Sequence, residues 1–287
     1  MDRDLTLFDD RKLTHGKTLV MGILNVNDDS FYGASRVATV ESAVLRAAEM
    51  ARQGADIIDI GAESTRPGSH GMAASEELDA LVPVVRAVRY ELANVPISVD
   101  TRKAEVAREA IAAGADIVND VSGLELPEEA GPMMRVVAES GALYVLMHTK
   151  GTPETMQAST HYDDFLGELD AFFAQKLSQL TVAGVNKERI VLDPGVGFGK
   201  RLGDNLDILA HIPRLKAYRL PLLIGASRKG FIGRITSAGD AGQRLEGTLA
   251  TTAVCAYEGV EIVRVHDVAE NAKVAAMADA IRARKGE

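Results

Sequence analysis

Two stretches of the sequence, GADIIDIG at residues 54–61 and GADIVND at residues 114–120, repeat one pattern. Each has a glycine suited to a turn, then a short apolar run suited to a buried strand, then polar side chains where that run ends. A looser third copy, GVEIVRVHDV, occupies residues 259–268. The recurrence of one short pattern along the chain indicates a repeated structural unit.

Five further apolar runs have the same character: TLVMGILN (18–25), PISVD (96–100), LYVLMH (143–148), IVLDPG (190–195) and PLLIGAS (221–227). Nearly continuous apolarity is typical of parallel strands that are covered on both faces. Amphipathic patterns such as ESAVLRAAEMARQG (41–54) lie between the runs, and several end in glycine, as helices do. Eight such units predict a (β/α)₈ barrel of the TIM type, with an open doubly wound sheet as the alternative.

The length and composition fit one soluble domain. A chain of 287 residues lies within the range of a single α/β barrel, and no linker interrupts it. We therefore predict one domain over residues 1–287, with a short N-terminal extension over about residues 1–17. The net charge of -9 disfavours binding to nucleic acid or to an anionic membrane.

The cysteine content and the chain start bear on the compartment. Cys255 is the only cysteine, so neither an internal disulfide nor a multi-cysteine metal site can form. The start, MDRDLTLFDDRK, is acidic and lacks the apolar core of a signal peptide. These features predict a cytoplasmic protein.

Polar side chains follow the strand candidates at the end where barrel enzymes carry their chemistry. A single Asp or Asn after a strand is usually a helix N-cap or a turn residue, but eight strands that all end in polar residues predict a site. The residues expected at this rim are Asn25, Asp59, Asp100, Asn119, Asp120, His148, Asp193, Lys229, Arg264 and His266.

Three motifs refine this expectation. DPGVGFGKR (193–201) fails both nucleotide-loop spacings, and we interpret it as a glycine-rich loop that presents Phe198 beside Asp193, or as a simple tight turn. GASRKGFIGR (225–234) places Arg228 and Lys229 where an anion could bind, unless it is a solvated basic turn. In RVHDV (264–268), Arg264 and His266 alternate and therefore face the same side, where a bound phosphate would supply the partner that they need.

These groups suit one kind of ligand. Asp100, Asn119 and Asp193 could accept hydrogen bonds from a donor-rich polar ring, and Lys229, Arg264 and His266 could bind a phosphate. Long polar loops at 25–36 and 61–69 resemble lids over a substrate. A metal, if present, would be Mg²⁺ between phosphate oxygens and an oxygen ligand such as Asn25.

The motifs, in their order along the chain, resemble those of the dihydropteroate synthases, pterin-binding barrel enzymes of folate synthesis. The resemblance covers about residues 21–268 and rests on MGILNVNDDSF, GADIIDIGAESTRPGS, ISVDTRKAEVAREA, GADIVNDVSGL, MHTKGTPETMQ, LDPGVGFGK, SRKGFIG and RVHDV. It implies a transferase that condenses 6-hydroxymethyl-7,8-dihydropterin diphosphate with 4-aminobenzoate, releasing diphosphate and giving 7,8-dihydropteroate. It also implies Mg²⁺, a homodimer and a target of sulfonamides.

The resemblance assigns roles to matching residues. Asp100, Asn119, Asp193 and Lys229 would hold the pterin, with Met147 lining its slot and Gly225 leaving it room. Asn25, Arg264 and His266 would hold the diphosphate, with Asn25 as a ligand of the metal. The 4-aminobenzoate site would be shaped by Thr65, Arg66, Pro67, Phe198 and Lys229. Among these, Asp100, Asp193, Lys229, Arg264 and His266 are the predicted catalytic residues.

The sequence departs from the family pattern in the first long loop, where Asn27 and Asp28 replace Thr-Pro and Tyr32 and Gly33 replace Ser-Asp. Gly230 replaces a serine after Ser-Arg-Lys, which removes a hydroxyl expected near the aminobenzoate carboxylate. Two alternatives therefore stay open. One is a catalytically impaired pterin-binding paralogue, and the other is a methyltransferase that acts between methyltetrahydrofolate and a corrinoid protein.

Overall fold

The computed structural model describes residues 5–6, 12–13, 16–26, 36–63, 69, 71–152, 155–156 and 160–286. Its centre is a parallel sheet of eight strands: β3 (Leu19–Asn25), β4 (Ile57–Gly61), β5 (Ile97–Asp100), β6 (Ile117–Asp120), β7 (Leu143–Met147), β8 (Ile190–Asp193), β9 (Leu223–Ile224) and β10 (Ile262–Val265). Each of these eight strands lies in one of the eight apolar runs that the sequence indicates.

The sheet closes on itself. Its order is β8-β7-β6-β5-β4-β3-β10-β9, so the last strand pairs with the first strand of the sheet. The two remaining edges, β8 and β9, meet through a single parallel bridge between Leu192 and Leu222. This closure confirms the predicted (β/α)₈ barrel. It excludes the alternative, an open doubly wound sheet, because the two edge strands of an open sheet do not pair with each other.

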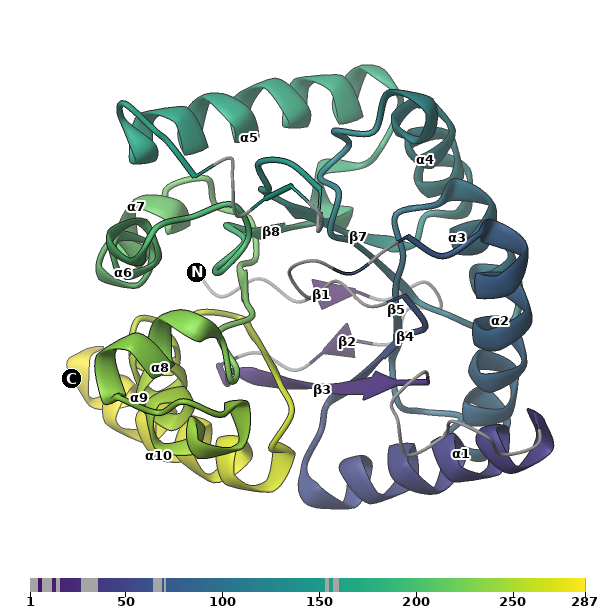
Figure 1. The fold of residues 1–287 in the computed structure, drawn as a ribbon, viewed down its shortest axis with the longest axis horizontal. Helices are drawn as coiled ribbons and strands as arrows, with labels where there is room; N and C mark the ends of the chain where they lie inside the picture. Colours follow the sequence, from purple (N-terminus) through teal and green to yellow (C-terminus); the bar gives the residue numbers. More distant parts are fainter. Residues whose placement is uncertain are drawn as a thin grey trace.

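Helices surround the barrel in chain order (Figure 1). They are α1 (Arg36–Gln53), α2 (Ala74–Glu91), α3 (Ala104–Ala112), α4 (Pro127–Ser140), α5 (Phe165–Val182), α6 (Leu202–Ala210), α7 (Ile212–Lys216), α8 (Gly230–Thr236), α9 (Leu245–Tyr257) and α10 (Val268–Ala283). Short 3₁₀ turns occupy Lys187–Arg189, Ala241–Gln243 and Arg284–Gly286.

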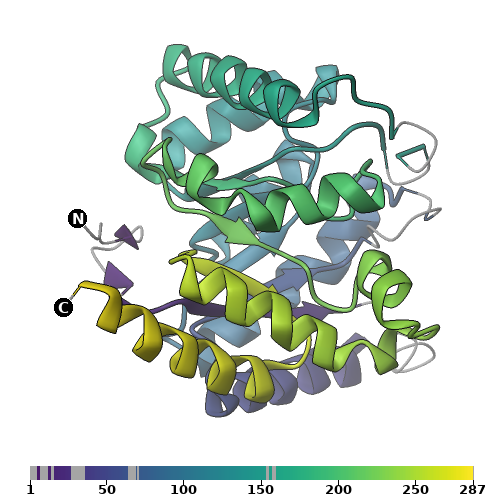
Figure 2. The ribbon, with the colours of Figure 1, turned by 90° about the vertical axis from the view of Figure 1, so that its left-hand side faces the viewer.

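Two short strands before the barrel, β1 (Leu5–Thr6) and β2 (Lys12–Leu13), pair with each other in antiparallel fashion and not with the barrel sheet. Figure 2 shows them at the same end of the molecule as the carboxyl end of α10. The barrel strands begin at this end, so the pair lies away from the rim that carries the strand-end polar residues. In the part of the chain that the structure describes, no helix is long and apolar enough to span a bilayer.

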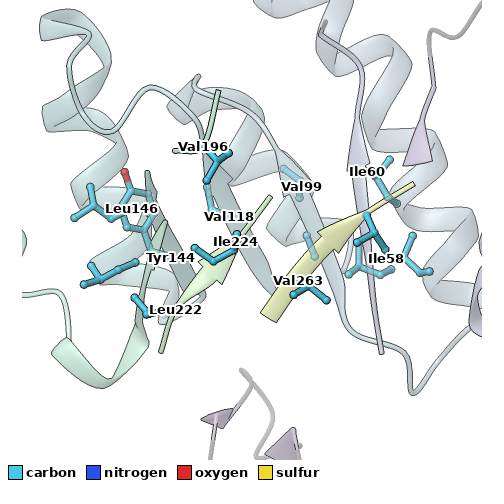
Figure 3. Packing of buried hydrophobic residues seen from close by; sticks show 14 of the residues in the cluster. Ile58, Ile60, Val99, Val118, Tyr144, Leu146, Val196, Leu222, Ile224 and Val263 are labelled. Carbon is cyan, nitrogen blue, oxygen red and sulfur yellow. The ribbon is translucent and has the colours of Figure 1, made fainter. Parts of the chain in front are cut away.

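Each barrel strand has an inner and an outer face. The inner residues form an apolar cluster of Leu19, Met21, Ile57, Ile117, Leu143, Val145, Val191, Leu223 and Ile262. The outer residues, among them Ile58, Val118 and Tyr144, pack in the larger cluster against the helices (Figure 3). Because side chains alternate along a strand, Asp59, Asp100, Asn119, Asp193 and Arg264 share the inner face and continue it toward the carboxyl ends.

The repeated glycine–acid pattern has a structural cause at the other end of the barrel. Its glycines have positive φ, +103° at Gly54, +116° at Gly114 and +75° at Gly259, and each lies between a helix and the next strand. Glycine adopts this conformation without the steric cost of a Cβ. The pattern therefore includes the turn that returns the chain from a helix to the sheet.

The acids of the same pattern, Asp56, Asp116 and Glu261, attach that turn to the neighbouring strand. Each carboxylate accepts a backbone N–H at 2.8–2.9 Å, from Val20, Ile97 and Leu222 respectively. Each also pairs with a cation, Lys17, Arg89 and Lys216 respectively. The repeat thus fixes the register of adjacent strands by a charged hydrogen bond, and this explains why it recurs in the sequence.

Replacing Asp116 by Ala tests this role. Asp116 is 3 % exposed, and its carboxylate accepts hydrogen bonds from the Ile97 N–H and the Arg89 guanidinium. The substitution would remove this acceptor from both donors. We expect the free energy of unfolding, measured by urea denaturation, to fall by about 2–4 kcal/mol. The control is Asp163→Ala, because the Asp163 side chain is 96 % exposed and its ion pair should contribute less than about 0.5 kcal/mol. Equal effects of the two substitutions would contradict this account.

Candidate functional site

The barrel topology brings the sequence-predicted residues to one end of the molecule. Parallel strands all present their carboxyl ends to the same rim. Four of the predicted residues are the last residues of their strands: Asn25 of β3, Asp100 of β5, Met147 of β7 and Asp193 of β8. Asn119 is the penultimate residue of β6, and Arg264 lies in β10, with His266 just after that strand. Gly225 follows β9, and Lys229 is the N-cap of α8. Thr65, Arg66 and Pro67 lie outside the described residues, as do Asn27, Asp28, Tyr32 and Gly33.

The guanidinium of Arg264 connects three strands inside this rim. Its Nε donates to Asp59 Oδ2 at 2.6 Å, and its Nη2 donates to Asp100 Oδ2 at 2.7 Å. The Asp59 side chain is fully buried, and the Asp100 side chain is 7 % exposed. Two carboxylates of the protein thus already bind Arg264, so the expectation that it needs a bound phosphate as a partner is wrong. Its role in binding a diphosphate stays a prediction.

Acceptors without a partner lie beside this ion pair. Asp59 Oδ1, Ser98 Oγ and Asn119 Oδ1 are buried and have no hydrogen-bond partner in the described part of the protein. Asp59 pairs with Ser98, and Asp100 pairs with Asn119, in the register of β4, β5 and β6, so the three groups are neighbours. A buried polar atom without a partner costs about 1–3 kcal/mol. A polar ligand with N–H donors would satisfy these atoms.

Burial changes the acidity of the rim carboxyls. The pKa of Asp100 is raised to about 7, mainly by burial, while Arg264 lowers it and Asp59 raises it further. The pKa of Asp193 is also raised by burial, against the opposing charge of Lys229. Asp100 therefore lies close to the balance between a carboxylate acceptor and a protonated donor near neutral pH. Such a group suits recognition of a ring with polar edges.

Lys229 and Phe198 lie together next to Asp193. The Lys229 Nζ donates to the carbonyl of Val196 and lies 4.5 Å from the centroid of the Phe198 ring. Burial lowers the pKa of Lys229 to about 8, although Asp193 raises it. A Cβ on Gly225 would lie 3.9 Å from the Lys229 Nζ and 3.8 Å from the Arg264 Cβ, both ordinary van der Waals contacts. The expectation that this glycine leaves room for a ligand stays a prediction.

His266 and Arg228 differ in their surroundings. The His266 ring Nδ1 lies 3.0 Å from Ser227 Oγ, which also accepts the His266 backbone N–H at 3.2 Å. The guanidinium of Arg228 instead binds Asp267 through Nε and Nη2. The prediction that Arg228 presents its charge to an anion is therefore not supported by the geometry, because an acid of the next strand–helix connection already pairs with it.

Asn119 and Asp120 end β6 side by side but point to opposite faces. Asn119 Nδ2 lies 3.5 Å from Asp59 Oδ2 inside the barrel. Asp120 accepts the Tyr144 hydroxyl at 2.7 Å and the Ser122 hydroxyl and N–H, on the outer face of the sheet. Asp120 is thus a structural residue of the strand end, and only Asn119 belongs to the site.

The structure gives partners to Asp59 and His148, which the sequence placed at the rim without a specific role, and to Lys200, to which the sequence assigned no role. Asp59 binds Arg264, whereas the sequence predicted only that Asp59 lies at the rim. The signal in the sequence is the alternation of Ile57, Asp59 and Gly61 along β4, which places Asp59 on the inner face. Lys200 and His148 form a buried pair beneath the glycine-rich loop, with the Lys200 Nζ 2.9 Å from His148 Nδ1. No local pattern reveals that this lysine is buried.

A metal ion at this rim would need ligands from the substrate as well as from the protein. No group of three or more His, Cys, Asp or Glu side chains in the described ranges could hold a metal ion. Asn25, at the carboxyl end of β3, is partly exposed. One amide oxygen fits Mg²⁺ only where substrate phosphates and water supply the other ligands.

The sequence and the fold are both similar to those of known pterin-binding proteins. The chain matches the family described as pterin binding enzyme over residues 21–266. It is 44 % identical to a dihydropteroate synthase of Synechocystis, over 96 % of this chain and 93 % of that protein. The fold is similar to that of the Yersinia pestis dihydropteroate synthase solved with a sulfonamide drug (39 % identity, TM-score 0.90, covering 98 % of this chain and 100 % of that one).

A Xanthomonas albilineans dihydropteroate synthase solved with 4-aminobenzoic acid is similar as well. It is 38 % identical, with a TM-score of 0.89, and the match covers 99 % of both chains. The family match includes every described residue that we place at the rim, from Asn25 to His266. On its sequence, its closed barrel and the inward-facing acids and cations at its rim, this chain belongs to the family of pterin binding enzymes.

Proposed function

We propose that the protein is a dihydropteroate synthase, which joins 6-hydroxymethyl-7,8-dihydropterin diphosphate to 4-aminobenzoate in folate biosynthesis. The observation that carries this proposal is the cluster of inward acceptors on β4, β5, β6 and β8 beside Lys229, Arg264 and His266. A pterin ring offers N–H donors to the first group, and a diphosphate offers anionic oxygens to the second. The named relatives are synthases of this type.

The pterin would bind inside the rim. Asn119 Oδ1, which is buried without a partner in the described structure, would accept an N–H of the ring together with Asp100 and Asp193. Lys229 would donate to a ring oxygen or nitrogen, and Met147 would line the slot as the last residue of β7. The ring would thereby satisfy acceptors that the protein leaves open, which favours binding.

The diphosphate would lie toward β3 and β10. Arg264 keeps its Nη1 donors, which make no hydrogen bond to any described residue, and His266 and Asn25 lie at the ends of neighbouring strands. With Asn25 as one ligand, Mg²⁺ would neutralise charge on the diphosphate and so make it a better leaving group. Arg264 and His266 would supply further positive charge or donors to the same oxygens.

The reaction is a displacement at the methylene carbon of the pterin. The C–O bond breaks and its electron pair leaves with the diphosphate, while the electron-rich pterin ring spreads the positive charge left on the methylene. Asp193 and Asp100 stabilise that charge electrostatically. The aniline nitrogen then forms the C–N bond and loses a proton to solvent. No protein nucleophile is needed, so the chain acts by positioning and electrostatics.

The 4-aminobenzoate would enter beside Phe198 and Lys229. Their contact forms one wall of this part of the site, and Thr65, Arg66 and Pro67 are proposed for the other. Gly230 begins α8, and a Cβ there would meet no atom within 4 Å, so the position has room for the serine of the family pattern. Backbone N–H groups at this helix start could bind the carboxylate in place of that hydroxyl. Sulfonamides would compete for the same place.

We also propose a homodimer. Val254 and Tyr257 on α9 and Met277 and Ile281 on α10 are large apolar side chains that are 37–64 % exposed, and the two helices pack against each other. A second copy of the chain would cover them. The cytoplasmic location stays a prediction.

Product formation tests the proposed function against its alternatives. We expect the purified protein to form 7,8-dihydropteroate, identified by its mass, only when the dihydropterin diphosphate, Mg²⁺ and 4-aminobenzoate are all present. Binding of the pterin without product would favour an impaired paralogue, whose altered residues are Asn27, Asp28, Tyr32 and Gly33. Methyl transfer from methyltetrahydrofolate to a corrinoid protein would favour the methyltransferase.

Lys229→Ala and Asp193→Asn test the electrostatic part of the mechanism. Each removes a charge that we place next to the reacting pterin, so each should lower kcat by at least ~10²-fold. The matched controls are Lys187→Ala and Asp163→Asn, because both residues are exposed and neither is one of the residues that we place at the rim. Turnover close to that of the unmodified protein in either test variant would remove that residue from the mechanism.

The pH dependence of kcat/KM follows from the lowered pKa of Lys229. The amine is charged below about pH 8 and neutral above it, so kcat/KM for the dihydropterin diphosphate should fall about tenfold per pH unit above pH 8. In Lys229→Arg the side chain stays charged throughout this range. The fall in kcat/KM above pH 8 should therefore disappear, even if kcat/KM of this variant is lower than that of the unmodified protein at every pH. If kcat/KM of the arginine variant falls above pH 8 in the same way, the titrating group is a residue other than Lys229.

A further inference from the structure

Lys200 ends the glycine-rich loop that follows β8, and it is buried. Its residue is 5 % exposed, and its Nζ contacts three acceptors: His148 Nδ1 at 2.9 Å, the His148 carbonyl at 3.1 Å and the Phe198 carbonyl at 3.0 Å. No carboxylate forms an ion pair with it in the described structure. Two of the acceptors belong to His148, which directly follows β7, and the third belongs to the loop itself.

The loop lies directly on the chain that follows β7. At Gly195, where φ is +69°, a Cβ would lie 1.9 Å from the carbonyl oxygen of His148, so the two backbones are too close for any side chain. The Tyr162 hydroxyl also donates to the carbonyl of Gly199 at 2.9 Å. Lys200 is thus one of several groups that hold the loop in place, and among the described residues it is the one whose side chain binds the carbonyl of Phe198.

The chemistry of the pair suits a fixed contact. Burial, and then the nearby charge of Lys200, lowers the pKa of His148 to about 2, so the imidazole is neutral and its Nδ1 can accept a hydrogen bond. An ammonium has three N–H donors for the three acceptors. Burial lowers the pKa of Lys200 to about 7, and the neutral amine would still donate two hydrogen bonds. Lys200 can therefore hold the loop in either form.

Phe198 connects this buried contact to the site. Its carbonyl accepts from Lys200, while its ring lies 4.5 Å from the Nζ of Lys229. Lys200 has no further donor for a substrate once its three hydrogen bonds are made. Any effect of Lys200 on the reaction must therefore pass through the position of Phe198.

We infer that Lys200 is a positioning residue for 4-aminobenzoate: by holding the Phe198 carbonyl against the end of β7, it sets the Phe198 ring beside Lys229. A buried lysine that is bound only to carbonyls and a neutral imidazole is costly for stability, which is the pattern expected of a group kept for a specific geometry. This inference rests on the proposed function, because it assigns Phe198 to the aminobenzoate side of that site.

The test is a double-mutant cycle between Lys200→Met and Phe198→Ala. Methionine keeps the length and apolar stem of lysine but cannot donate. We expect Lys200→Met to raise KM for 4-aminobenzoate by ~10-fold while kcat changes less than ~3-fold, and Phe198→Ala to have a similar effect. If Lys200 acts through Phe198, the double variant should resemble Phe198→Ala alone. Effects that multiply, or an unchanged KM in Lys200→Met, would overturn the inference. Lys187→Met, at an exposed lysine, is the control.

Hydrogen exchange of the loop gives a readout that does not depend on catalysis. In the unliganded protein, amides of residues 195–199 should exchange at least ~10-fold faster in Lys200→Met, while the rest of the barrel is unchanged. An unprotected loop in the parent protein, or equal exchange in both proteins, would contradict the inference. If the parent protein forms no dihydropteroate, the proposed function fails, but this exchange experiment still decides whether Lys200 holds the loop.

A milder pair of substitutions covers the case in which Lys200→Met does not fold. His148→Leu removes one of the three acceptors, whereas His148→Asn keeps an amide oxygen near the position of Nδ1. We expect His148→Leu to raise KM for 4-aminobenzoate and loop exchange in the same direction as Lys200→Met, and His148→Asn to restore both. Equal behaviour of the leucine and asparagine variants would count against the hydrogen bond as the cause.

Discussion

A single guanidinium holds two buried carboxylates inside the barrel, and the arrangement of the rim depends on this contact. Asp59 has no exposed side-chain surface, so without Arg264 it would be an uncompensated buried charge. Removing one partner of such a pair typically costs about 3–5 kcal/mol. The contact requires β10 to lie beside β3 and so to face β4 and β5, which only the closed barrel provides. Fold and site thus share one electrostatic constraint.

The two ends of the barrel use acids for different purposes. At the end where the strands begin, Asp56, Asp116 and Glu261 each bind a backbone N–H and a cation, so their bonding capacity serves the fold. At the other end, Asp59 and Asn119 keep buried oxygen atoms without a partner in the described structure. The acids at the strand starts thus serve stability, whereas the acceptors without a partner lie at the rim where we propose that the ligand binds. This division is typical of barrel enzymes.

The fold could be predicted from the sequence because its signals are local. Apolar runs, helix periodicity and the glycines between them give the order of the elements, and that order with eight repeats indicates the barrel. The strand ends were likewise predicted, since a polar residue after an apolar run marks them. What local patterns could not show was the partner of each polar group: Asn119 and Asp120 are adjacent, yet one faces the site and the other binds Tyr144. Arg228 and Lys200 have partners 39 and 52 residues away, which only the closed structure brings near.

A crystal structure of the protein with 7,8-dihydropteroate would test the central claim most directly, because that product contains both halves of the proposed substrates. We expect the pterin ring inside the rim, within hydrogen-bond distance of Asn119 Oδ1 and the Asp193 carboxylate, with the aminobenzoate part extending past Lys229 and Phe198. We also expect that Arg264 still bridges Asp59 and Asp100. A pterin bound elsewhere, with Asn119 Oδ1 still lacking a partner, would contradict it.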